Sequence, residues 1–127
     1  MIRYQKFFYV LFLISLSLVL IACLNSSDAT VTLIRIPHLD KIAHFLMHCT
    51  LMFTVTGAVS SKRNAYLGIV AGIGLGILME IIQQSIPGRG FEYYDIIANS
   101  LGTISGFLLF ETFRSRIYRL LDKILNK

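Results

Sequence analysis

The chain has 127 residues, of which 55% are hydrophobic and only 15% are charged. Because soluble domains carry about a quarter of charged residues, this composition excludes an ordinary soluble enzyme and predicts one integral membrane domain over residues 1–127. The formal net charge of +5 does not predict a nucleic-acid partner. Lysine and arginine lie in short blocks between apolar runs, which is typical of the loops of membrane proteins.

Four apolar runs predict an all-α fold, a four-helix transmembrane bundle. A helix needs about 20 residues to cross a bilayer. The expected helices cover about residues 7–24, 40–61, 65–86 and 93–111. We expect the third and fourth helices to give the weaker hydropathy signals, because functional polar groups lower the score of a true span.

The first apolar run has two interpretations. Leu20-Ile21-Ala22-Cys23 resembles the lipobox of a bacterial lipoprotein signal peptide, which is cleaved before the cysteine. An uninterrupted apolar run of this length is also an ordinary first span. The sequence therefore leaves open whether the first segment is retained or is removed before a lipid-modified Cys23.

The basic residues predict the orientation of the helices. Nine of the twelve lie before the first helix, between the second and third, or after the fourth, whereas Arg35, Lys41 and Arg89 lie on the other side. The positive-inside rule then places both termini in the cytoplasm. We expect a multi-pass protein of the bacterial cytoplasmic (inner) membrane.

The last segment, residues 114–127, predicts a separate amphipathic basic helix. Its apolar residues recur at helical spacing and its basic residues fill the opposite side. We expect this helix to lie on the anionic inner leaflet, with membrane lipids as partners. A frayed, solvated tail is the alternative. The apolar residues are Ile117, Leu120, Leu121, Ile124 and Leu125.

Polar residues lie toward the same end of the second, third and fourth expected helices. Asp40, His44 and His48 recur every four residues and so share one face. Asp95 and Asn99 begin a similar row on the fourth helix, and Gly102 and Gly106 continue it. If these faces meet, they line an outward-opening polar pocket.

Small residues form a row on the third expected helix. Gly68, Gly72 and Gly76 recur every four residues, and the row continues to Glu80. Such a G-x-x-x-G face lets another helix approach closely. The partner is a helix of the same chain or a second copy, so a homo-oligomer through this face is one expectation.

Three chemical interpretations of the polar residues stay open. In the first, Lys41 and Arg89 only neutralise carboxylates and lock the helices. In the second, His44 and His48 bind one metal ion with a carboxylate as third ligand; no other cofactor is expected. In the third, the site handles an anion and protons. Its expected residues are Arg89 as anion contact, Glu80 as base, His44 as acid, and Asp40, Lys41, Gln83, Asp95 and Asn99 as further ligand-binding groups.

Four linked motifs over residues 40–106 resemble those of VanZ-like proteins. They are Asp40-Lys41-Ile42-Ala43-His44-Phe45, the pair Glu80 and Gln83, the segment from Pro87-Gly88-Arg89 to Asp95, and Asp95 followed by Asn99 and Gly102. The family commonly has tyrosine where this chain has His48. The resemblance implies a small multi-helix protein of the bacterial cell envelope, in a family whose founding member is associated with resistance to the glycopeptide teicoplanin.

These observations predict a VanZ-like envelope protein whose outward pocket binds or modifies an anionic component, such as a lipid-linked precursor. Altered glycopeptide susceptibility would be one consequence. The sequence leaves open whether the protein is an enzyme. A non-catalytic scaffold, in which the same residues only lock the helices, and a small proton-linked transporter are the alternatives.

Overall fold

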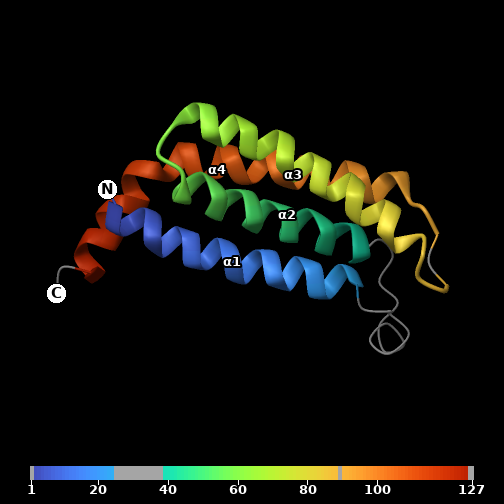
Figure 1. Ribbon diagram of the computed structural model, residues 1–127. Coiled ribbons are helices and arrows are strands. Elements are labelled where there is room, and N and C mark those ends of the chain that lie inside the picture. Colours follow the sequence, from blue (N-terminus) through green and yellow to red (C-terminus); the bar gives the residue numbers. More distant parts are fainter. Residues whose placement is uncertain (1, 25–38, 89, 126–127) are drawn as a thin grey trace.

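The computed structural model consists of four α-helices (Figure 1). It describes residues 2–24, 39–88 and 90–125, and this part of the chain contains no strand. The predicted all-α, four-helix fold is confirmed. The helices are α1 (Ile2–Leu24), α2 (Leu39–Ala58), α3 (Lys62–Gln83) and α4 (Tyr93–Leu125).

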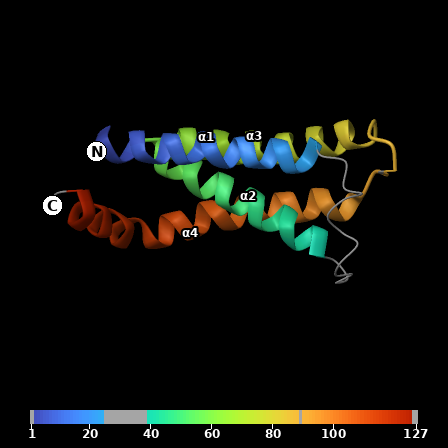
Figure 2. The same ribbon diagram turned by 90° about the horizontal axis from the view of Figure 1, so that it is seen from below.

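Consecutive helices run in opposite directions, so the two ends of the bundle differ. Both termini and the α2–α3 connection lie at one end, and the α3–α4 connection lies at the other (Figure 1). Helix α2 contacts each of the other three helices and packs most extensively against α4. A second view shows α2 crossing the bundle diagonally (Figure 2). The α2–α4 contact is therefore the centre of the fold.

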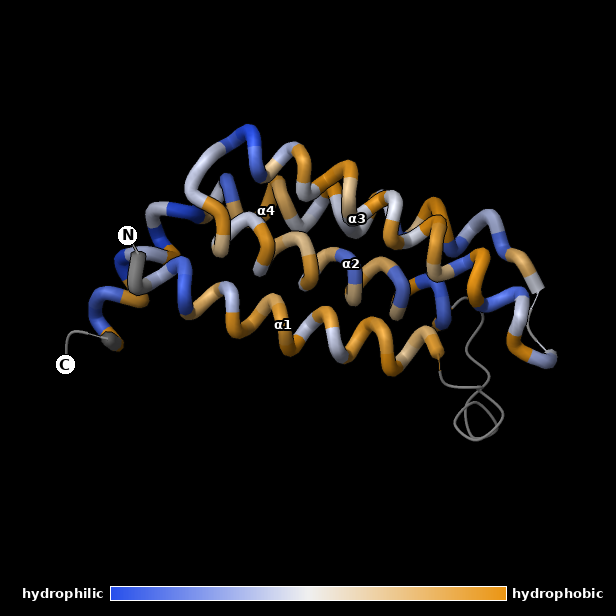
Figure 3. Tube along the Cα trace, in the orientation of Figure 1, coloured by the Kyte–Doolittle hydropathy of each residue, from blue (hydrophilic) through white to orange (hydrophobic). Residues whose placement is uncertain are grey.

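Three described helices, α1, α3 and α4, are long and apolar enough to cross a membrane. Because α3 is among them, the expectation that the third helix gives a weak hydropathy signal is wrong, whereas α4 gives the lowest of the three signals, as expected. Helix α2 is not among them. Hydrophilic positions recur along the first half of α2 (Figure 3). Two of them, His44 and His48, are buried against neighbouring helices. Because α2 is shielded by its partners, it can carry polar residues that an isolated span could not.

Helix α3 lies about three residues earlier than predicted, at Lys62–Gln83 instead of 65–86. Its start is fixed by Ser61, whose hydroxyl accepts a hydrogen bond from the Asn64 N–H (3.1 Å). Its end precedes a turn that contains Pro87 and Gly88. Gly88 has a φ of +83°, a conformation that favours glycine.

The fourth helix is longer than expected. It runs without a break to Leu125, so the prediction of a separate helix from residue 114 is wrong. No glycine or proline interrupts it after Gly106, and Glu111 forms an ion pair with Arg114 across the expected boundary. The segment keeps its amphipathic pattern. Its apolar residues Leu120 and Ile124 are exposed and are next to basic residues in the sequence.

Aromatic side chains pack the end of the bundle that holds the termini. The Phe110 ring is fully buried, and its centroid lies 5.2 Å from that of Phe8 and 5.1 Å from that of Phe53. Tyr4 stacks on Tyr118 at 5.5 Å between centroids. These contacts fasten the last turns of α4 to the first turns of α1.

Two glycines allow α2 and α4 to approach closely. A Cβ atom at Gly102 would collide with the backbone carbonyl of Phe45, and one at Gly106 with that of Cys49. Both positions were expected to line the packing face of the fourth helix. The structure confirms that this face meets α2.

The glycine row of α3 also packs within the chain. Gly72 and Gly76 approach Thr103 and Asn99 of α4, and Gly68 approaches α2. The homo-oligomer predicted through this row stays a prediction. A second copy at this face would have to replace these internal contacts.

Candidate functional site

Polar side chains of α2, α3 and α4 converge at the end of the bundle opposite the termini. Glu80 and Asn99 are each 2% exposed and Asp95 is 6% exposed. We call these residues and their neighbours the polar cluster. It comprises Asp40, Lys41, His44, Glu80, Glu92, Asp95 and Asn99.

The Lys41 ammonium is surrounded by three carboxylates. Its Nζ lies 2.5 Å from Asp40 Oδ2 and 2.8 Å from Asp95 Oδ1, and it also forms an ion pair with Glu92. The Asp40 and Glu92 side chains are 55% and 53% exposed, whereas Asp95 is buried. One ammonium against three carboxylates leaves this group with a surplus of negative charge.

The same three carboxylates have the spacing of a cation site. One oxygen from each of Asp40, Glu92 and Asp95 lies within 4.8 Å of the others. The Lys41 ammonium occupies this position, so the chain supplies its own cation. Within the described ranges this is the one group of three or more possible ligands, and it does not include His44 or His48. The predicted histidine metal site stays a prediction.

His44 joins two residues of α4. Its Nδ1 lies 3.1 Å from Asn99 Oδ1, and its Nε2 lies 3.5 Å from Asp95 Oδ2. An amide oxygen accepts hydrogen bonds, so the contact to Asn99 places a proton on Nδ1. The contacts to Asn99 and Asp95 together fix the orientation of the imidazole ring. Asp95 and Asn99 lie against His44, where the spacing placed them.

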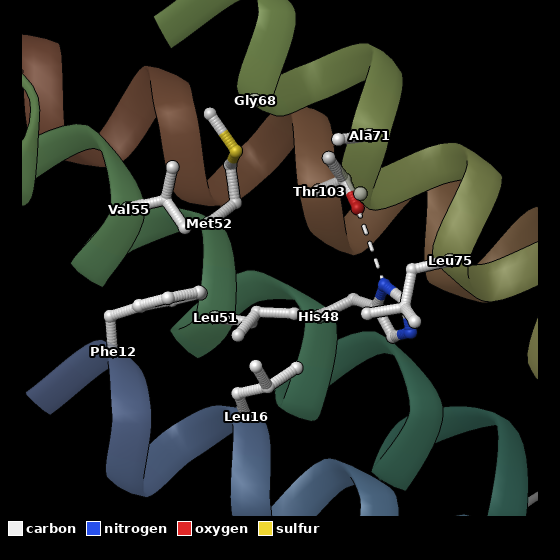
Figure 4. A pocket seen from close by; sticks show the side chains of 11 residues that line it. Phe12, Leu16, His48, Leu51, Met52, Val55, Gly68, Ala71, Leu75 and Thr103 are labelled. Atoms are coloured by element: carbon white, nitrogen blue, oxygen red, sulfur yellow. Dashed lines mark hydrogen bonds between the residues drawn. The ribbon is translucent and has the colours of Figure 1, made fainter.

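His48 lies one turn deeper in the bundle. Its Nδ1 is 3.4 Å from the hydroxyl of Thr103 (Figure 4). That hydroxyl donates to the Asn99 carbonyl at 2.9 Å. Its Nε2 has no hydrogen-bond partner among the described residues. His48 also lines an apolar cavity of about 360 Å³ between α1, α2 and α3. The polar contacts thus continue from Lys41 to the middle of α2.

Glu80 holds the α3–α4 connection. Its Oε1 accepts a hydrogen bond from the backbone N–H of Glu92 at 2.7 Å. Its Oε2 is buried and has no hydrogen-bond partner among the described residues. No hydrogen bond joins Glu80 to His44 in that part of the chain, so the predicted acid and base are not a directly bonded pair.

Two other predicted site residues differ from the rest. Gln83 donates a hydrogen bond from Nε2 to the Cys23 carbonyl at 3.1 Å, which ties α3 to α1 rather than to the cluster. Cys23 itself is buried beside Val19. Arg89 lies outside the described residues, so its predicted role as the anion contact stays a prediction.

The sequence interpretation missed two participants, Glu92 and Thr103. Glu92 lies just before α4, where residue spacing on a helix gives no information about its contacts. Thr103 follows Asn99 by four residues and so shares its helix face. That spacing was the available signal for Thr103.

Two cavities, each of about 360 Å³, touch the series of polar contacts, one at each of its ends. The first includes His48, and the second is a groove between α2 and α4 that includes Lys41. Neither is lined by Glu80, Asp95 or Asn99, which are almost completely buried. In the described residues these three members of the cluster are packed, whereas Asp40 and Glu92 lie at its exposed edge.

The chain has apolar helices of spanning length around a buried polar cluster. These two features place it in the class of helical membrane proteins with a polar core. The family follows from the sequence. The VanZ/LLP1 family profile matches residues 4–114. The chain therefore belongs to the VanZ/LLP1 family, and the predicted resemblance is confirmed and extends to α1.

A curated relative is the uncharacterized protein C11E3.10 of Schizosaccharomyces pombe. It is 35% identical over 77 residues, which are 58% of this chain and 48% of the relative. The chain thus spans about half the length of the relative. Because the relative comes from a yeast, the likeness does not by itself place this chain in a bacterium. No solved structure matches the chain.

Proposed function

We propose that this protein is a multi-pass protein of the bacterial cytoplasmic membrane that binds or modifies an anionic, lipid-linked component of the cell envelope. In this proposal the termini face the cytoplasm and the polar cluster faces outward. The end of the bundle with the termini also carries most of the described basic residues, which supports this orientation. Reduced susceptibility to glycopeptides would be one consequence.

The observation that carries the proposal is the second carboxylate oxygen of Glu80. A buried polar atom without a partner costs about 1–3 kcal/mol, and such atoms in native proteins call for an explanation. Among the described residues, Glu80 Oε2 is such an atom. A group that must take up a proton from a ligand needs a free oxygen, so the cost is explained if Glu80 is a base.

His44 supports an acid–base role from the other side of the cluster. Asp95 and Asn99 orient its ring, as the positioning of a general acid requires. A proton could pass from His44 to a bound group while Glu80 accepts another. Because the two side chains are not bonded to each other, the ligand itself would have to bridge them.

Charge places a condition on this proposal. The described cluster has more carboxylates than cations, and an anion would be repelled by them. Binding therefore requires Arg89 as the main anion contact. Lys41 would contribute only after it leaves at least one of its carboxylates.

Two other functions have specific support. A non-catalytic scaffold is favoured by the pairing of Lys41 with three carboxylates, which ties α2 to α4 and to the segment before it without any ligand. A proton-linked transporter is favoured by the polar contacts that continue inward to Thr103 and His48. Both alternatives use the same residues. The scaffold binds no ligand, whereas the transporter moves protons past these residues.

The test is a Glu80→Gln variant expressed in a glycopeptide-susceptible bacterial host. Glutamine keeps an oxygen for the Glu92 N–H but cannot accept a proton as a carboxylate does. We expect the wild-type chain to reduce teicoplanin susceptibility in this host. For the variant we expect normal folding, seen as a single size-exclusion peak in detergent, and loss of that phenotype.

Thr54→Val is the matched control. It removes a buried contact to Ser15 (3.1 Å between hydroxyl oxygens) outside the cluster. We expect this variant to keep the phenotype. If Glu80→Gln instead unfolds the protein, the scaffold function is favoured. If it folds and retains the phenotype, the proposed acid–base role is wrong.

A further inference from the structure

We propose that the groove between α2 and α4 binds one hydrocarbon chain of a bilayer phospholipid whose headgroup carries a primary amine. The groove has a volume of about 360 Å³. We call it the amine-lipid groove. Its lining residues are Lys41, Ile42, Phe45, Tyr94, Ile97, Ala98 and Leu101.

The shape and chemistry of the groove suit a hydrocarbon chain. Lys41 is the one charged residue in its lining, and the other side chains are apolar or aromatic. Ile42, Ile97 and Leu101 are each about half exposed, so the groove is open along the side of the bundle. Its volume falls within the range of about 300–1,000 Å³ that is usual for small-ligand sites.

The surroundings of the groove select the occupant. Helix α4 is long and apolar enough to cross a membrane, so the medium beside its exposed apolar face is lipid. The groove begins at the polar cluster and continues down α4 to Leu101. A phospholipid has the same arrangement, a charged headgroup followed by an apolar chain.

Charge complementarity selects the headgroup. At the mouth of the groove, Lys41 is shared by Asp95, which is buried, and by Asp40 and Glu92, which are more than half exposed. The surplus negative charge repels an anionic headgroup and attracts an ammonium. A primary ammonium also donates up to three hydrogen bonds, which the exposed carboxylates can accept.

This inference goes beyond the proposed function. It concerns the lipid beside the bundle and not the ligand of Glu80 and His44. Its two decisive carboxylates, on Asp40 and Glu92, are exposed, so replacing them should not disturb packing. The lipid preference can therefore fail while the acid–base role holds, and the reverse is equally possible.

The chain contains no tryptophan, which makes a direct measurement possible. A Leu101→Trp variant places one fluorophore in the groove. A Val70→Trp variant is the matched control, because Val70 is 69% exposed on α3 and does not line the groove. Each variant is reconstituted into vesicles, and its fluorescence is quenched by phospholipids with brominated chains.

Brominated phosphatidylethanolamine is compared with brominated phosphatidylglycerol. At Leu101→Trp we expect the amine lipid to bind about two- to fivefold more strongly, the range that one or two exposed ion pairs supply. At Val70→Trp we expect equal quenching. Adding Asp40→Asn and Glu92→Gln to Leu101→Trp should abolish the preference without changing the helical circular-dichroism signal.

Three results would overturn the proposal. One is equal quenching by both lipids at Leu101→Trp. Another is a preference that survives removal of both exposed carboxylates. The third is a preference for phosphatidylglycerol that appears only with added Mg²⁺, because the carboxylates would then hold a metal ion and not a headgroup amine.

Discussion

The two ends of this bundle are held together by different forces. At the end with the termini, Phe8, Phe53 and Phe110 pack edge to face in a dry aromatic core. At the other end, charged and amide groups contact one another around Lys41 and His44. Aromatic packing holds the helices together but provides no ionisable groups for catalysis or ligand binding. The polar end carries a desolvation cost that aromatic packing does not, which makes it the place to look for function.

The largest effect is expected from Phe110→Ala. Removing a fully buried ring leaves a cavity, and such substitutions cost about 3–5 kcal/mol. We expect the variant to lose its size-exclusion peak at a much lower temperature in detergent than the wild type. Any folded fraction should keep the teicoplanin phenotype that the proposed function predicts. A phenotype lost from folded protein would show that the aromatic end also serves function.

A smaller effect is expected from Gly102→Ala, which tests the packing between the two ends. The new methyl group meets the Phe45 carbonyl and lies about where the backbone of α2 runs. Overpacking of this kind costs about 1–3 kcal/mol. Thermal unfolding in detergent measures the change.

Gly74→Ala is the control for Gly102→Ala. A Cβ atom at Gly74 meets nothing within 4 Å. Alanine also favours a helix over glycine by about 1 kcal/mol, so we expect equal or greater stability. If both variants lose the same stability, close α2–α4 packing is not the reason.

The smallest effect is expected from Lys41→Met, which removes the cation from the polar end. We expect a loss of about 1 kcal/mol at neutral pH, because two of its three partners are exposed. Thermal unfolding of the variant and the wild type in detergent at about pH 7 measures the difference. A variant as stable as the wild type would contradict the charge account of this end.

Residue spacing predicted the meeting of α2 and α4 well. Asp95, Asn99 and Gly102 lie on one face of α4, and His44 meets the first two as the four-residue repeat implied. Such contacts are predictable because a helix places every third or fourth residue on the same side. The family motifs marked the same region.

Other features could not be read from the sequence, for physical reasons. Gln83 binds a backbone carbonyl on α1, and backbone groups have no sequence signature. Glu92 reaches Lys41 from a connection without helical periodicity. Hydropathy judges each helix alone, so it could not show that α2 is sheltered by three partners. The packing of Leu121 near the end of α4 in one cluster with Phe8 of α1 is a tertiary contact that spacing along the chain does not reveal.

The stacking of Tyr4 on Tyr118 has a practical consequence. Because the first turns of α1 lie beside the last turns of α4, a short flexible link could join them. The chain could then be opened at the turn between α2 and α3, residues 59–61, to give a circular permutant with the same helix neighbours. Such a rearranged protein would keep its polar end untouched, so its assembly would reveal whether the order of synthesis matters for insertion.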